Sequence, residues 1–417
     1  MLIKDMIAEQ AQLAKIAALK MAGITTEMKN SALLAMAEAL EKRQDEILAE
    51  NAAEVETARQ NSTRLNMIDR LILNPKRIAD MAEGLRQTVK LPDPIGAEDF
   101  EITRPNGLKI RRVRVPFGVV GIIYEARPNV TVDAAALCLK SGNACILRGG
   151  SEAIRTNTKL TEILNEAAIS QGIPEHAIEF IKITDRDAII AMCRLRKLID
   201  VIIPRGGAGL ITRVVEHSIV PVIETGTGVC HVYVDKAANF EMALKVALSA
   251  KISRPSVCNA METLLIHKDI AKEFLPQIAK LMVENKVELR GDEGCLKIYP
   301  DMKLATEENW KTEYNDLICN VKIVEDLDAA INHINKYNTQ HSDAIITEDA
   351  AAAKKFQTLV DSACVYVNTS TRFTDGFEFG FGAEIGISTQ KLHARGPMGL
   401  EALTTMKYLI EGNGQTR

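Results

Sequence analysis

Hydrophobic and polar residues alternate along this 417-residue chain with three different periods, each typical of one kind of structure. Residues 4 to about 90 are rich in Ala, Glu, Leu and Lys, and apolar residues recur there at helical spacing, as in Leu33, Met36, Ala37 and Leu40. This pattern predicts amphipathic helices, and a scaffolding role is the simplest interpretation of them.

A second pattern, with a period of two, covers residues 101–115. Ile110, Arg112 and Arg114 alternate with other side chains, and the turn-forming Pro105-Asn106-Gly107 precedes them. The pattern predicts a β-hairpin. A charged hairpin between a helical region and an α/β region needs a structure to pair with, so we expect it to form a subunit contact.

In the third pattern, short unbroken apolar runs alternate with helical segments. The first series predicts strands at residues 119–124, 144–148, 178–183, 198–203 and 220–223, with helices at 132–139 and 152–170. A second series predicts strands at 262–266, 321–324, 343–346 and 364–367, with helices at 239–252 and 269–283 among them, and a last strand at 403–410. Unbroken apolar strands separated by helices indicate mostly parallel sheets covered on both faces, so we predict an α/β fold.

Composition narrows the class of protein further. A chain with 47% hydrophobic and 25% charged residues is typical of a soluble globular protein, and its length predicts two to three domains. The net charge of -4 gives no reason to expect nucleic acid as a partner, and no apolar run is long enough to span a membrane. Residues 1–5 lack the pattern of a signal peptide, so we expect a cytoplasmic protein.

The eight cysteines are scattered through apolar segments, as reduced thiols usually are, and none forms a C-x-x-C pair. The seven histidines are dispersed as well, so we expect no metal site.

One cysteine differs from the others in its position between two predicted elements. Cys258 follows the predicted helix at 239–252, which Pro255 ends, and it precedes a predicted buried strand. Neighbouring Arg254 favours the thiolate, which makes Cys258 a candidate nucleophile, although most cysteines are simply small buried hydrophobes.

A glycine-rich turn joins the predicted strand at 198–203 to the helix that follows it. Gly206, Gly207 and Gly209 in this turn allow backbone N–H groups and a helix amino terminus to approach a phosphate. Glycines are also common in ordinary tight turns, so both interpretations stay open.

Several longer motifs occur in a fixed order along nearly the whole chain. They are residues 124–129 (YEARPN), 140–143 (KSGN), 148–151 (RGGS), 203–207 (IPRGG), 230–235 (CHVYVD), 253–260 (SRPSVCNA), 333–343 and 393–398 (HARGPM). With these motifs the chain resembles the gamma-glutamyl phosphate reductase family, the proline-biosynthesis branch of the aldehyde dehydrogenase superfamily. One departure is Asn338, where we expect Gly or Ser.

The resemblance implies an aldehyde-dehydrogenase-like architecture with two parallel-sheet α/β domains and a β-hairpin oligomerisation arm. Residues 1–100 and 118–235 would form the dinucleotide-binding domain, and residues 236–385 the catalytic domain with the nucleophilic cysteine. Residues 101–117 and 400–417 would form the arm. A homo-oligomer is implied, with dimer and tetramer both left open.

The resemblance also implies an activity, the NADPH-dependent reduction of L-glutamyl 5-phosphate to L-glutamate 5-semialdehyde and phosphate. Cys258 would form the thioester. The Cys258 backbone amide and the Asn129 side chain would stabilise the oxyanion. Arg127 and Arg254 would bind the substrate, with Arg205 close to them, because fixed cations suit a phosphate dianion.

Cofactor contacts follow from the same resemblance. Arg148 stands where the superfamily usually has lysine, and a guanidinium there suits the ribose 2′-phosphate of NADP. Gly206, Gly207 and Gly209 would admit the pyrophosphate, and Asp316 would hold a ribose.

Three alternatives remain from the sequence. Glu224 stands where hydrolytic aldehyde dehydrogenases carry a general base, so a hydrolytic NAD(P)-dependent enzyme is one of them, although reduction needs no base and we interpret Glu224 as a wall or cofactor-side residue. The others are a cysteine hydrolase, for which no His-Asn pair stands out, and a non-catalytic binding protein of the same fold. A transient contact with glutamate 5-kinase is a further open hypothesis.

Overall fold

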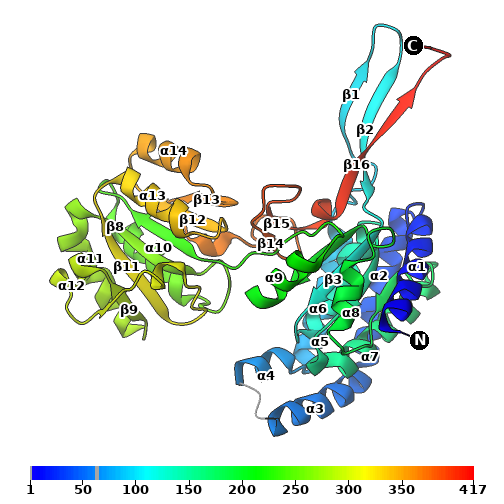
Figure 1. Ribbon diagram of the computed structural model, residues 1–417, viewed down its shortest axis with the longest axis horizontal. Helices are drawn as coiled ribbons and strands as arrows, with labels where there is room; N and C mark the ends of the chain where they lie inside the picture. The colour runs from blue at the N-terminus through cyan, green and yellow to red at the C-terminus, as the bar shows by residue number, and fades with distance from the viewer. Residues whose placement is uncertain (1, 62–64) are drawn as a thin grey trace. The chain divides into compact units, whose positions relative to one another are not determined.

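The computed structural model describes residues 2–61 and 65–417, and the chain divides into two compact units (Figure 1). The first unit comprises Met1–Thr225, Gly380–Gly386 and Met398–Arg417, and the second comprises Gly226–Phe379 and Ile387–Pro397. Each unit contains a parallel sheet with helices, and an antiparallel hairpin belongs to the first. The predicted fold class is therefore confirmed.

The amino-terminal region is helical, as the apolar spacing predicts. Its helices are α1 (Ile3–Met21), α2 (Thr26–Lys42), α3 (Gln44–Gln60), α4 (Leu65–Leu71) and α5 (Pro75–Lys90). Residues 62–64 of the predicted helical region lie outside the described residues. Thr25 and Asn74 begin α2 and α5 by accepting hydrogen bonds from the N–H groups of Met28 and Arg77, which satisfies helix-end donors.

The sheet of the first unit has the order β5 (Ile178–Phe180), β4 (Ala144–Arg148), β3 (Val119–Tyr124) and β6 (Val201–Arg205), all parallel. The helices α6 (Pro128–Lys140), η1 (Ser151–Ala153), α7 (Ile154–Ser170), α8 (Asp187–Cys193) and α9 (Ala208–His217) connect or follow these strands. The strand predicted at 220–223 is wrong. Only Val222 forms a bridge, to Ile202, because Pro221 has no N–H group with which to extend a ladder.

The predicted hairpin consists of β1 (Glu98–Thr103) and β2 (Lys109–Pro116), which meet at Gly107, whose φ is +88°. Figure 1 shows the carboxy-terminal β16 (Thr404–Glu411) lying along β2, so this chain itself supplies one pairing partner of the hairpin. Arg111 ties the three strands together, since it bridges Glu98 at 2.8 Å and Glu411 at 2.7 Å. The expected subunit contact stays a prediction.

The sheet of the second unit is parallel throughout, in the order β10 (Lys303–Leu304), β9 (Glu288–Gly291), β11 (Ile318–Val324), β8 (Met261–His267), β7 (Cys230–Val234), β12 (Ser342–Ile346) and β13 (Cys364–Val367). Its helices are α10 (Phe240–Ile252), α11 (Lys268–Glu284), α12 (Glu293–Ile298), α13 (Leu327–Tyr337) and α14 (Ala350–Leu359). The remaining short elements are η2 (Asn309–Lys311), η3 (Thr371–Phe373), η4 (Leu400–Leu403), β14 (Ile387–Ser388) and β15 (Gly396–Pro397).

Apolar side chains cover both faces of this second sheet. Val232 belongs to a core with Phe274, whereas the next residue, Tyr233, belongs to a different core with Phe356. Successive side chains of a strand point to opposite faces, so β7 is buried on both sides. The domain prediction places β7 in the dinucleotide-binding domain, but the ladder bonds of β7 to β8 and β12 place it in the second unit.

Because all strands of this sheet are parallel, their amino ends share one edge. The chain enters β7, β8, β11 and β12 from loops at this edge, and those loops carry several of the candidate residues. No helix in the part of the chain that the structure describes is long and apolar enough to cross a membrane.

Candidate active site

Cys258 lies in the turn that joins α10 to β8, as the sequence predicts. Asn239 caps the start of α10, and Pro255 lies just beyond its end, where a helix cannot continue. Cys258 is partly exposed, whereas the other seven cysteines are buried. A partly exposed thiol between two ordered elements is the arrangement that a nucleophile requires.

The turn is anchored by the residue after the cysteine. The side-chain amide of Asn259 donates hydrogen bonds to the carbonyl oxygens of Thr374 at 2.8 Å and Arg372 at 3.3 Å, and the hydroxyl of Thr371 donates to the Asn259 carbonyl at 2.8 Å. The Arg372 guanidinium also donates to the Asn259 side-chain oxygen. These contacts fasten the cysteine turn to the η3 segment.

A buried ion pair joins the elements on either side of the turn. Lys251, in the last turn of α10, lies 2.8 Å from Glu262 near the start of β8, and neither side chain is exposed. Burial raises the pKa of the Glu262 carboxyl to about 7, and the charge of Lys251 works against that rise. The Asn315 N–H also donates to Glu262, at 3.3 Å, so the loop before β11 is tied to the same pair.

The first residue of β7 and the residues just before it contact the backbone of Cys258. The Cys230 thiol donates to the Cys258 carbonyl oxygen at 3.2 Å. Gly228 lies so close that a Cβ at this position would overlap the same carbonyl oxygen and lie 2.8 Å from the Cys258 Cα. Burial raises the pKa of the Cys230 thiol well above its ordinary value, which keeps this neighbour neutral.

The structure brings to the thiol a histidine that the sequence interpretation missed. The imidazole Nε2 of His341 lies 3.2 Å from the Cys258 Sγ. His341 immediately precedes β12 and is 1% exposed. The sequence analysis found no His-Asn pair that stands out beside the cysteine, and it did not single out His341 as a partner of Cys258. The sequence held one signal for this contact, which is the position of the two residues. Cys258 and His341 each precede a predicted strand, and the two strands belong to one parallel series.

Two arginines belong to the cysteine turn or contact it. Arg254, a predicted substrate-binding residue, is exposed in the cysteine turn, and Arg372, which the sequence interpretation missed, donates to the Ser253 hydroxyl at 3.1 Å. Burial lowers the pKa of the Arg372 guanidinium from its ordinary value, and the positive charge of Arg254 lowers it further, while Cys258 acts in the opposite direction. Two like charges held together favour the binding of an anion.

Asp316, the predicted ribose contact, is exposed in the loop before β11. Its carboxylate accepts a hydrogen bond from the Leu317 N–H at 2.7 Å. Because β11 pairs with β8 in parallel, Asp316 and Cys258 lie at the same edge of the sheet. The ribose contact itself stays a prediction.

The remaining candidates belong to the first unit. Arg127 is the residue before α6, and Asn129 lies in the first turn of that helix, where its amide donates to Asp133 at 3.2 Å. Burial raises the pKa of the Asp133 carboxyl to about 6, although this hydrogen bond and Arg205 both lower it. Glu224 is partly buried, and it lies next to Thr225, the last residue of the first segment of this unit. The roles of these residues stay predictions.

Arg148, at the end of β4, is only 7% exposed, so it is not a solvated residue at a strand edge. Its Nη2 donates to the Thr184 carbonyl at 2.9 Å, while its Nε is buried and has no hydrogen-bond partner among the described residues. Burial lowers the pKa of this guanidinium from its ordinary value. A buried cation with an unused donor suits an incoming phosphate.

The glycine-rich turn leads from β6 into α9, and Gly207 caps this helix without a side-chain hydrogen bond. The Gly207 N–H donates to Glu125 at 3.0 Å, and a Cβ on Gly206 would crowd the same carboxylate at 2.8 Å. A Cβ on Gly209 would meet no atom within 4 Å. Packing within the chain therefore explains glycine at 206 but not at 209, where open space lies beside the helix start.

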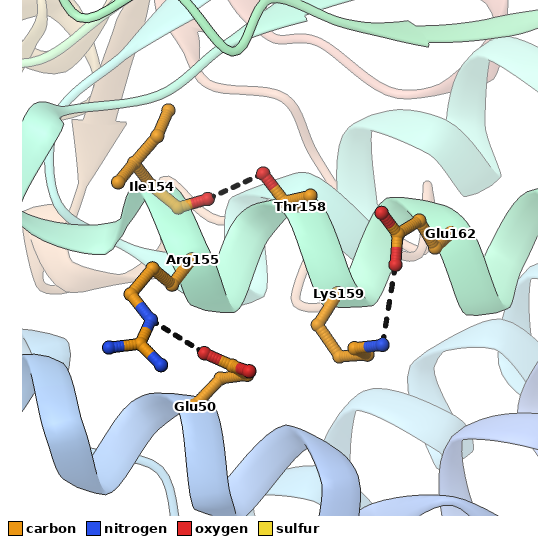
Figure 2. Close-up of a pocket in the computed structure, with 6 residues that line it drawn as sticks. All are labelled: Glu50, Ile154, Arg155, Thr158, Lys159 and Glu162. Atoms are coloured by element: carbon orange, nitrogen blue, oxygen red, sulfur yellow. Dashed lines mark hydrogen bonds and ion pairs between the residues drawn. The ribbon is translucent and has the colours of Figure 1, made fainter.

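A surface pocket of about 270 Å³ between α3 and α7 is unrelated to these residues (Figure 2). It is lined by Glu50, Ile154, Arg155, Thr158, Lys159 and Glu162. Its charges are already matched, because Arg155 lies 2.6 Å from Glu50 and Lys159 lies 3.3 Å from Glu162. We assign no chemistry to this pocket. In residues 2–61 and 65–417, no cluster of three or more metal-binding side chains occurs.

Comparison with known proteins agrees with this fold. The model of the aldehyde dehydrogenase family matches residues 4–295, and the chain belongs to that family. It is 57% identical to the gamma-glutamyl phosphate reductase of Moorella thermoacetica, over 98% of both chains. It is 58% identical to the protein of that name from Carboxydothermus hydrogenoformans, over 99% of this chain and 100% of the relative. The crystal structure of the gamma-glutamyl phosphate reductase of Thermotoga maritima superposes with a TM-score of 0.97 at 48% identity, covering 99% of each chain. Within the aldehyde dehydrogenases, the chain is thus a member of the gamma-glutamyl phosphate reductase family.

Proposed function

We propose that this chain reduces L-glutamyl 5-phosphate to L-glutamate 5-semialdehyde and phosphate, with NADPH as the reductant and a thioester on Cys258 as the intermediate. The observation that carries the proposal is the cysteine turn itself. It holds a partly exposed thiol in the same turn as Arg254 and within the electrostatic reach of Arg372, in a chain that belongs to the gamma-glutamyl phosphate reductases. The reaction is a step of proline biosynthesis from glutamate.

The charges around the thiol fit an acyl phosphate. The Cys258 thiolate attacks the acyl carbon and phosphate leaves. Arg254 and Arg372 offset the negative charge of the substrate and of the departing phosphate, and Arg127 is a further candidate for this role. The Cys258 N–H and the Asn129 amide stabilise the oxyanion that forms at the substrate carbonyl.

The residues of the proposed dinucleotide site fit NADP. The buried Arg148 has an unused Nε donor that suits the 2′-phosphate, and the open space at Gly209 beside the start of α9 suits the pyrophosphate. Gly206 and Gly207 complete that turn, and Asp316 binds a ribose. When bound, NADPH supplies the hydride that converts the thioester to the aldehyde.

The hydrolytic alternative differs in what releases the thioester. Fixed arginines favour phosphate, whereas Glu224 acting as a base would favour water. The reaction run in the oxidative direction distinguishes the two. We expect NADPH to form from NADP and glutamate 5-semialdehyde only when inorganic phosphate is present, and Glu224→Gln to keep this activity.

Phosphate-independent formation of glutamate that is lost in Glu224→Gln would show that the chain is a hydrolytic dehydrogenase. The variant Cys258→Ala should bind NADPH but retain less than a few per cent of the activity, because loss of a nucleophile removes the covalent path. An unreactive wild-type thiol without turnover would instead support a non-catalytic binding protein.

We place the enzyme in the cytoplasm as a homo-oligomer that uses the β1–β2–β16 arm as its contact between copies. Sedimentation of a variant that lacks β16 would test this assembly. Transfer of the labile acyl phosphate from glutamate 5-kinase by transient contact is consistent with the short lifetime expected of such a substrate, and co-sedimentation with the kinase would test it.

A further inference from the structure

We propose that His341 is the acid–base catalyst of thioester formation and acts as a dyad with Cys258. The proposal rests on the function given above, because it assigns the proton transfers of that reaction. The Nε2 of His341 and the Sγ of Cys258 are 3.2 Å apart, which is hydrogen-bond distance for sulfur. The thiol is the reacting group, so His341 touches the reacting atom itself.

The proposal assigns the thiol proton to Nε2, and the neighbours of the other ring nitrogen fit that assignment. Its Nδ1 lies 2.8 Å from the Ser342 hydroxyl, which lies 2.6 Å from the Thr374 hydroxyl, which in turn lies 2.7 Å from the Tyr366 hydroxyl. In the neutral imidazole that donates from Nδ1 to Ser342, Nε2 carries the lone pair and faces Cys258. The chain of hydroxyls then stabilises the imidazolium once Nε2 takes the proton.

The protein holds the dyad from both sides. The histidine backbone is fixed because its carbonyl accepts a hydrogen bond from the Cys364 N–H at 3.1 Å, at the start of β13. The cysteine is fixed by the Asn259 anchor and by the Cys230 thiol, which donates to the Cys258 carbonyl at 3.2 Å. The contact between Nε2 of His341 and Sγ of Cys258 is thus supported on both sides by hydrogen bonds to residues at or near the ends of strands.

The proton balance of the step is complete. His341 Nε2 takes the proton of the Cys258 thiol, and the resulting thiolate forms the C–S bond with the acyl carbon of L-glutamyl 5-phosphate. The C–O bond to the phosphate breaks, and its electron pair leaves with the phosphate oxygen. The imidazolium returns its proton to that oxygen, so hydrogen phosphate departs and His341 is neutral again. No oxidant, reductant or further acid is needed in this step.

The test uses the full chain with His341→Gln, which keeps a polar group near the thiol but cannot carry a proton. The rate of Cys258 alkylation by iodoacetamide at pH 7 reports thiolate formation without substrate or cofactor, and Cys258→Ala gives the blank for the buried cysteines. We expect this rate to fall at least about tenfold and kcat to fall about 10²- to 10⁴-fold, while Tm and NADPH binding stay close to wild type.

His267→Asn is the matched control. His267 is also buried, and it caps α11 by accepting from the Asp269 N–H, a role that asparagine can fill. Its alkylation rate and kcat should equal those of wild type. If His341→Gln does not fold, His341→Asn repeats the test, because its shorter amide can still bond Ser342 but cannot take a proton from Cys258.

An alkylation rate and a kcat within twofold of wild type in a folded His341 variant would overturn the dyad. Failure of the dyad can be distinguished from failure of the proposed function. If wild type shows no phosphate-dependent NADPH formation but its Cys258 reactivity still requires His341, the dyad stands and the assigned substrate is wrong.

Discussion

The replacement of Gly228 by alanine tests how tightly the cysteine turn is held. Gly228 precedes β7, and a Cβ there would overlap the Cys258 carbonyl oxygen and lie 2.8 Å from the Cys258 Cα. Atoms of the backbone cannot give way as a flexible side chain can. Because non-bonded carbon atoms rest at about 3.5–4.0 Å, the two segments must separate by more than about 1 Å at the overlapped oxygen.

The consequence for catalysis follows from that displacement. The Cys230 hydrogen bond to the Cys258 carbonyl, 3.2 Å in the present structure, would break, and the Sγ would leave its 3.2 Å contact with His341. A misplacement of about 1 Å at a reacting group costs on the order of 10²-fold in rate. We expect kcat of Gly228→Ala to fall by at least that factor, and the protein to lose about 1–3 kcal/mol of stability from overpacking.

Steady-state NADPH formation with phosphate measures the first effect, and thermal unfolding measures the second. Gly23→Ala is the control, because a Cβ at Gly23 would have only an ordinary contact of 3.7 Å with the Lys20 carbonyl. It should change neither quantity appreciably. A folded Gly228→Ala enzyme with a kcat within twofold of wild type would refute the reasoning, since the turn would then be free to move without loss of function.

Three further predictions concern other parts of the chain. Arg148→Ala should raise the KM for NADPH by about 10- to 100-fold and change that for NADH much less, because a hydrogen bond to a charged group contributes about 1.5–3 kcal/mol; equal weakening of both cofactors would contradict the 2′-phosphate contact. Asn129→Ala should lower kcat by roughly 10²-fold or more if its amide stabilises the oxyanion, whereas an unchanged kcat with a raised substrate KM would show that Asn129 only shapes the site. Burial lowers the pKa of His333 to about 2, so the folded protein stays neutral at this residue where the unfolded chain, with an ordinary pKa near 6.5, takes a proton. Stability from this residue is therefore complete above pH 6.5 and falls by about 2 kcal/mol on going to pH 5, and His333→Phe should remove that part of the pH dependence in denaturant titrations at pH 7 and pH 5; an identical loss in both proteins would contradict it.

The sequence predicts most of the fold because its strands are unbroken apolar runs. β8 and β12 are buried along their whole lengths, and both appear in the hydrophobic pattern. β10 is missed for the opposite reason, since its two residues are both exposed and carry no pattern. β7 and β9 are likewise absent from the predicted strands. The strand predicted at 220–223 shows a further limit. Its residues are apolar enough for a strand, but a ladder needs an N–H group that Pro221 lacks.

The residues of the candidate site also differ in whether the local sequence reveals them. Cys258 is found from the sequence because its own neighbours, a helix end and a proline, mark it as a turn residue between ordered elements. Arg372 reaches the turn through a short helix after β13, far along the chain from the cysteine, and local pattern carries no information on such a contact. Only the strand order of the folded sheet brings the two together.

That strand order also explains why the turn needs Gly228. Cys258 precedes β8 and His341 precedes β12, but these strands are not neighbours, because β7 lies between them. Adjacent strands are about 4.8 Å apart, so the starts of β8 and β12 are separated by about twice that distance, and the Cys258 and His341 side chains meet across the start of β7. The cysteine turn lies against the residues that precede β7. Gly228 is the residue over which its backbone passes, and the missing side chain allows the carbonyl of Cys258 to come down onto this segment and meet the Cys230 thiol. The same glycine that permits this close approach thus determines whether the thiol can reach the imidazole, so a single methyl group added at Gly228 is expected to affect catalysis more than folding.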